Sequence, residues 1–137
     1  MSLVKDNRVI CDFRYITDEE MSGIFQISDA VVLPYENTSI NSGIMINAFS
    51  NGTTVIGTNI EMLQDYSSNL VYGYSFNSRE EHLSSLANAF LDFERDYKLG
   101  STACKRVELE NITNTCNTWS EVSRVLLNVL QKECTRE

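Results

Sequence analysis

The sequence lacks three features that would each indicate a particular class of protein. It contains no run of about eighteen apolar residues, so it predicts no membrane-spanning helix. It has a single histidine, His82, and its four cysteines show no Cys-x-x-Cys spacing, so a Cys/His metal site is not expected. Basic residues are few, because 11 lysines and arginines stand against 19 acids, for a net charge of −8. That charge argues against a nucleic-acid-binding surface, although a single bound nucleotide remains compatible with it.

The chain has the composition of one globular domain. Its 137 residues are 42% hydrophobic and 22% charged, which is ordinary for a domain with its own core. No internal linker or repeat divides the sequence, so residues 1–137 are expected to form a single domain. The N-terminal residues lack the apolar stretch of a signal peptide, and a cytoplasmic location is therefore expected.

Strand-like and helical patterns alternate in the first half of the sequence. The alternation of apolar side chains predicts a strand over Arg8–Ile16. Short apolar runs predict three more strands, over Ala30–Leu33, Thr54–Gly57 and Leu70–Tyr74. Helices are expected between them, one beginning near Thr17 and one near Ser42. This order predicts an α/β fold, a Rossmann-like parallel sheet of about four strands with flanking helices.

The second half of the sequence is expected to be helical. Ser78 is followed three residues later by Glu81, which is the pattern of a capping box, and the helix that starts there should end at Gly100. Further helices are expected over Ser101–Glu110 and Trp119–Gln131. The sole histidine, His82, lies near the start of the first of these helices and is expected on the surface.

One helix start is a candidate ligand site. Ser42, Gly43 and Ile44 follow the predicted strand Ala30–Leu33 and open the next helix. Unpaired N–H groups and the helix dipole at such a position suit a diphosphate, and a glycine allows the ligand to approach the backbone. The alternative is that Ser42 only caps the helix and that Gly43 is a packing residue.

The stretch from Asp18 to Thr58 resembles the C-terminal, donor-binding half of two-domain (GT-B) glycosyltransferases of the group 1 type, and the resemblance extends over most of the chain, from Arg8 to Leu130. The matching features are, in order, Asp29, the strand end Val32-Leu33-Pro34-Tyr35, the helix start Ser42-Gly43, Ala48, and Gly52-Thr53-Thr54-Val55-Ile56. The segment around Trp119, Val122 and Ser123 is similar to the terminal helix of that family. The resemblance implies a nucleotide-sugar-binding domain that is incomplete relative to the full donor domain of the family.

The resemblance also implies an activity and a site. The activity is transfer of a hexose from a UDP- or GDP-sugar to a glycan or lipid-linked acceptor, with no metal or other cofactor. The implied nucleotide-sugar-binding residues are Tyr35, Ser39, Ser42, Gly43, Ile44 and Asn47. Asn47 would contact the ribose hydroxyls, or else be a buried amide satisfied by the backbone. Tyr35 would flank the nucleotide or cap the core, and Ser39 would lie near the donor sugar or be an ordinary loop serine.

The sequence departs from the family pattern in ways that favour a second hypothesis. Ser39 and Asn47 stand where many members have a pair of glutamates. Two β-α units, a basic pair for the diphosphate and the acceptor domain have no counterpart before Arg8, so this chain alone is expected to be inactive. The alternative function is therefore a truncated, catalytically inactive interaction module that would associate with a second copy of itself as a homodimer. A weaker rival is another doubly wound protein that shares only the sheet with this family.

The missing units would leave a gap beside the predicted strand Ala30–Leu33. We expect this gap to close directly, through the predicted strand Arg8–Ile16, or to be filled by a partner chain. If it closes directly, the helices should lie mostly on one face of the sheet. The other face would then be covered by the C-terminal helices or by a dimer mate. Arg14 would lie at the ligand-binding edge, where it would meet a phosphate or remain solvated.

Overall fold

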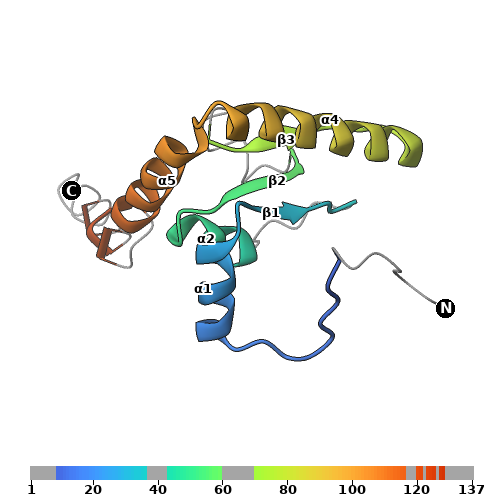
Figure 1. Ribbon diagram of the computed structural model, residues 1–137. Coiled ribbons are helices and arrows are strands. Elements are labelled where there is room, and N and C mark those ends of the chain that lie inside the picture. The colour runs from blue at the N-terminus through green and yellow to red at the C-terminus, as the bar shows by residue number, and fades with distance from the viewer. Residues whose placement is uncertain are drawn as a thin grey trace, which may run out of the picture.

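Three short parallel strands form the sheet in the part of the chain that the structure describes (Figure 1). The computed structural model describes residues 9–36, 43–59, 70–116, 120–121, 123–125 and 127–128. Its elements are α1 (Asp18–Ile27), β1 (Ala30–Leu33), α2 (Gly43–Ser50), β2 (Thr54–Thr58), β3 (Tyr72–Tyr74), α4 (Arg79–Lys98) and α5 (Thr102–Cys116). The strand order is β1-β2-β3, with Val31 opposite Val55 and Ile56 opposite Tyr72. All three strands therefore end at the same edge of the sheet.

The α/β prediction is confirmed, but the predicted first strand is wrong. Residues 9–17 contain no strand, and the sheet has three strands among the described residues rather than four. The arm, as we call residues 9–17, exposes large apolar side chains, namely Val9, Ile10, Phe13 and Tyr15. Its alternating pattern is that of a strand, but a strand also needs a neighbour for its backbone hydrogen bonds. The arm does not pair with β1, so the expectation that the gap beside β1 closes directly is wrong as well.

Local capping signals set the helix starts where the sequence predicts them. Thr17 caps α1, with its hydroxyl accepting from the Glu20 N–H at 3.3 Å while the Glu20 carboxylate accepts from the Thr17 N–H at 3.1 Å. Ser78 caps α4 by accepting from the Glu81 N–H at 3.2 Å. The Glu81 carboxylate reaches back one residue further than a capping box requires, to the Asn77 N–H at 2.8 Å.

Glycine ends two of the helices in the way that the sequence predicts. Gly52 follows α2 with a φ of 70°, and Gly100 follows α4 with a φ of 72°, a conformation that other residues adopt at a cost. Helix α5 continues to Cys116, beyond the predicted end at Glu110. The predicted helix Trp119–Gln131 lies partly outside the described residues, and its described positions are helical.

The sheet is covered on both faces, by different helices. On one face, α1, α2 and α5 contribute to a core cluster of Phe25, Leu33, Met45, Ala48, Phe49, Val55, Leu70, Val71 and Leu109. On the other face, α4 lies along β3 (Figure 1) and covers β2 and β3 through a second cluster of Ile56, Tyr72, Tyr74 and Ala89. The C-terminal helix α4 thus covers the face that α1 and α2 leave open, but Val32 on β1 keeps 37% of its surface exposed.

A polar cluster ties the strand β3 to α4 and α5. The Lys105 ammonium donates to Asp96 Oδ2 at 2.7 Å and to the Tyr72 hydroxyl oxygen at 2.8 Å. The Tyr72 hydroxyl donates to the same Asp96 oxygen at 2.9 Å. These hydrogen bonds, that from Lys105 first, hold the pKa of Asp96 below its usual value.

This cluster should make the free energy of unfolding depend on pH in the acid range. Because the pKa of Asp96 is lower in the folded chain, the unfolded chain takes up the proton first as the pH falls. The stabilisation is therefore present above the ordinary carboxyl pKa of 3.8 and is lost as the pH falls from there through the folded value. Urea unfolding at about pH 6 and about pH 3, which lie above and below the ordinary carboxyl pKa, should show a smaller loss of stability in acid for Asp96→Asn than for the wild type.

The exposed Asp92 on the same helix provides the control. Its carboxylate pairs with Arg95 at 3.0 Å in solvent, where an ion pair adds little. The Asp92→Asn variant should therefore keep the acid sensitivity of the wild type. If the Asp96 and Asp92 variants lose equal stability between the two pH values, the cluster does not act as described.

Candidate functional site

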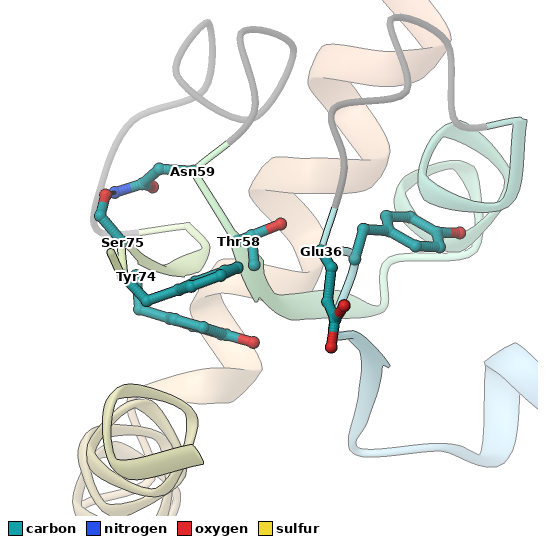
Figure 2. Close-up of a pocket in the computed structure, with 7 residues that line it drawn as sticks. Glu36, Thr58, Asn59, Tyr74 and Ser75 are labelled. Carbon is teal, nitrogen blue, oxygen red and sulfur yellow. Dashed lines mark hydrogen bonds between the residues drawn. The ribbon is translucent and has the colours of Figure 1, made fainter. Parts of the chain in front are cut away.

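An open cleft of about 260 Å³ lies where the three parallel strands end (Figure 2). Its lining residues are Tyr35, Glu36, Thr58, Asn59, Tyr74, Ser75 and Phe76. They come from the ends of β2 and β3, from the residues that follow these strands, and from the residues that follow β1. In open α/β sheets this edge is the usual place for a ligand.

Thr58, the last residue of β2, carries a buried hydroxyl without a partner. The residue is 8% exposed, and its Oγ1 makes no hydrogen bond. The two other buried threonines of this segment are satisfied, because Thr53 donates to the Phe25 carbonyl and Thr54 to the Leu70 carbonyl, both at 2.6 Å. An unpaired buried hydroxyl costs about 1–3 kcal/mol. Such groups are rare in native proteins and often mark the place of a water or ligand.

Most of the other polar groups of the cleft are already bonded to one another. The Asn59 side-chain amide donates to the Ser75 hydroxyl at 3.2 Å. The Tyr74 hydroxyl and His82 Nε2 share a hydrogen bond of 2.8 Å, and the Phe76 ring stacks on His82 at 4.0 Å. Burial raises the pKa of Tyr74, so its phenol stays protonated at neutral pH. This wall of the cleft is therefore largely aromatic, and its polar side chains are engaged within the protein.

The single charge on the lining of the cleft is negative. Among the lining residues that the structure describes, Glu36 alone carries a formal charge, and it is exposed. Figure 2 shows Glu36 across the cleft from Thr58, whose hydroxyl oxygen extends toward that side. The cleft thus offers a carboxylate and an unpaired hydroxyl, and no lysine or arginine is found on the described part of its lining.

The structure brings one predicted site residue to the cleft and places two more at the start of α2. Tyr35 lines the cleft and also packs against the first core cluster, so both roles considered for it are compatible with its position. Gly43 is the first residue of α2 and is exposed, as is Ile44. A Cβ atom built on Gly43 would meet nothing within 4 Å. Ser39 and Ser42 lie outside the described residues.

Asn47 faces the helix α1 rather than the cleft. Its amide nitrogen donates to Met21 Sδ at 3.4 Å. The side-chain amide of Asn51 donates to the Asn47 carbonyl at 2.8 Å and to its Oδ1 at 3.2 Å. Asn47 is therefore engaged within the protein, but it is half-buried and bonded to side chains, whereas the alternative considered for it is a buried amide satisfied by the backbone.

Two further residues differ from their sequence-based expectations. His82 is 6% exposed and buried against Tyr74 and Phe76, so its expected surface position is wrong. Arg14 lies on the arm instead of a strand end; it is exposed, which agrees with the solvated alternative, and forms ion pairs with Asp12 at 3.0 Å and Glu20 at 2.9 Å. These contacts stabilise the arm next to α1 and provide no charge to the cleft.

Sequence reasoning missed six of the seven lining residues. Thr58 and Asn59 come at and directly after the end of β2, and Ser75 and Phe76 come directly after β3. The signal that identifies them is position alone, since residues that follow parallel strands gather at the ligand-binding edge.

The described residues show neither a metal site nor a membrane-spanning helix. Within the described ranges, no group of three or more His, Cys, Asp and Glu side chains could hold a metal ion, and none of the described helices has the length and hydropathy to cross a membrane. Comparison with protein-family models, curated proteins and solved structures finds no match. The function is therefore inferred from the site itself.

Proposed function

We propose that this chain is the nucleotide-sugar-binding half of a glycosyltransferase. It would hold a UDP- or GDP-sugar at the carboxyl edge of the sheet for transfer of a hexose to a glycan-type acceptor. The observation that supports this proposal is the cleft of about 260 Å³ at the ends of three parallel strands. Its lining offers an aromatic wall and a small number of polar groups, a combination typical of small-molecule sites.

The diphosphate of the donor would lie at the start of α2. Three residues join the end of α2 to the start of β2, so the helix runs back along the sheet and begins toward the edge where the cleft lies. The first N–H groups of a helix have no partner within it, and the helix dipole favours an anion there. The exposed Gly43 leaves open space at this point. The same amides would stabilise the diphosphate as it departs in the transfer reaction.

Thermal unfolding with UDP, GDP and their sugar conjugates tests the proposal. A ligand present at about one hundred times its dissociation constant adds about 2.7 kcal/mol, which raises Tm by several degrees in a domain of this size. The Gly43→Leu variant should fold normally, since nothing lies within 4 Å of the added Cβ. It should lose the shift, because its side chain would occupy the place of the diphosphate.

Gly23 provides a matched control. It lies in α1, and a Cβ built there also meets nothing within 4 Å, so Gly23→Leu should keep the response to the nucleotide. Equal shifts in both variants would mean that the diphosphate does not bind at the start of α2. A complete lack of response to every nucleotide would contradict nucleotide-sugar binding.

A second candidate function is a self-associating interaction module. It is supported by the arm, where Phe13 is 87% and Tyr15 85% exposed, and by β1, whose outer edge has no strand partner in the described part of the chain. Exposed apolar side chains and unpaired strand edges are features that natural proteins usually cover. Nucleotide affinity and the mass of the protein in solution separate this candidate from the first.

A further inference from the structure

We infer that the cleft recognises two adjacent hydroxyl groups of a sugar ring, through the Glu36 carboxylate and the Thr58 hydroxyl. This inference rests on the proposed nucleotide-sugar function and specifies which part of the donor enters the cleft. The ring would be the ribose of the nucleotide or the hexose that it carries.

The charge on the lining favours a neutral ligand group over a phosphate. Glu36 brings a negative charge to the cleft, and none of the lining residues within the described ranges is basic. An anion placed there would meet a like charge without compensation. The diphosphate therefore belongs at the start of α2, and the portion of the ligand in the cleft should be uncharged.

Glu36 is suited to adjacent hydroxyl groups. An ionised carboxylate only accepts hydrogen bonds, and its two oxygens can accept from two donors side by side. Two neighbouring hydroxyls on a ring present such a pair of donors. Glu36 follows the end of β1 at Leu33 by three residues. In Rossmann-type sheets an acidic residue near the ligand-binding edge binds the ribose hydroxyls in this way.

Thr58 supplies the second contact because its hydroxyl is unpaired. It can donate to a ligand oxygen or accept from a ligand hydroxyl, and a ligand there would remove the cost of the unpaired group. The other polar side chains of the cleft, Asn59, Ser75 and Tyr74, are bonded within the protein. Asn47 is also engaged, with Met21 and Asn51, and is not among the described residues that line the cleft.

The test measures affinity of the whole 137-residue chain for UDP, 2′-deoxy-UDP, UDP-glucose, GDP, free ribose and free glucose by calorimetry. Glu36→Gln should weaken binding of the recognised ligand about tenfold or more, and Thr58→Val about three- to tenfold. The valine variant should fold at least as well as the wild type, since it keeps the shape and removes the unpaired hydroxyl. Glu94→Gln is the matched control, because Glu94 lies toward the far end of α4 and pairs with Lys98; its affinity should not change.

The probes separate the two possible sources of the hydroxyl pair. If the ring is ribose, 2′-deoxy-UDP should bind the wild type as weakly as UDP binds Glu36→Gln. If it is the hexose, UDP and 2′-deoxy-UDP should bind alike, and the Glu36 change should weaken only UDP-glucose.

The outcomes also distinguish failure of this inference from failure of the proposed function. In one outcome, Gly43→Leu abolishes nucleotide binding, whereas Glu36→Gln and Thr58→Val bind as tightly as Glu94→Gln. This outcome would overturn the inference and keep the proposed function. Binding of ribose or glucose alone, weakened by the Glu36 change without any nucleotide binding, would support the inference and overturn the proposed function. No binding of any probe would overturn both.

Discussion

Replacement of Phe49 by alanine should lower the free energy of unfolding by about 3–5 kcal/mol. The side chain is fully buried at 0% exposure, within the cluster to which α1, α2, α5 and β1 contribute. Its removal loses the transfer free energy of the ring and leaves a cavity that close-packed neighbours fill only in part. A domain of this kind has a total stability of about 5–15 kcal/mol, so much of the protein should be unfolded at a moderately raised temperature.

Urea unfolding followed by far-ultraviolet circular dichroism measures this loss. Phe13→Ala is the matched control, because Phe13 is 87% exposed on the arm and its loss should change the stability by no more than about 0.5 kcal/mol. If Phe49→Ala costs no more than Phe13→Ala, α2 does not pack on the sheet as described. If Phe13→Ala costs as much as Phe49→Ala, the arm is covered in solution, as the interaction module would require.

The helices could be predicted from the sequence because residues close to each boundary determine where the helix begins or ends. Thr17 and Glu20 each accept a hydrogen bond from the other's backbone N–H group. The Ser78 hydroxyl likewise accepts from the Glu81 N–H group. Gly52 ends α2 through its own positive φ. None of these signals depends on residues distant in the sequence, so a pattern of a few letters is sufficient.

The arm shows where local pattern fails. Its alternation of apolar residues is sound evidence of strand propensity, but a strand exists only when a neighbour accepts its hydrogen bonds. The neighbour lies elsewhere in sequence or space, and no pattern within residues 9–17 reveals whether it is present. The predicted strand and the predicted closing of the gap beside β1 failed for this one reason.

The sequence was sufficient to predict where on the sheet the candidate site lies, but only some of the residues that form it. The carboxyl edge of the sheet follows from the β-α alternation, and Tyr35 follows from its place after β1. Thr58 could not be singled out, because its missing hydrogen bond depends on what three separate segments bring to the edge. The direction of the Asn47 side chain depends on how α2 is rotated about its axis relative to α1. Because α2 is short and apolar on more than one side, its sequence pattern does not determine this rotation.

Replacement of Gly57 by valine should cost about 3 kcal/mol, at the upper end of what overpacking causes. A Cβ atom at this position would lie 2.9 Å from the Leu33 carbonyl oxygen, closer than such atoms approach. The obstacle is backbone on the neighbouring strand β1, so β1 and β2 would have to separate where they are paired. Valine is otherwise favoured in strands, so a loss of stability would report the contact and not the propensity of the residue.

Gly23→Val is the control, since a Cβ on Gly23 meets nothing within 4 Å and the change should stay within about 0.5 kcal/mol. Equilibrium unfolding in urea compares the two variants, and equal stability of both would contradict the described pairing of β1 with β2. The same pairing sets the positions of Glu36 and Thr58 at the cleft, because the register partners Leu33 and Gly57 come three residues before Glu36 and one residue before Thr58. Gly57→Val should therefore also weaken binding of any ligand that contacts both residues, even at a temperature where the variant remains folded.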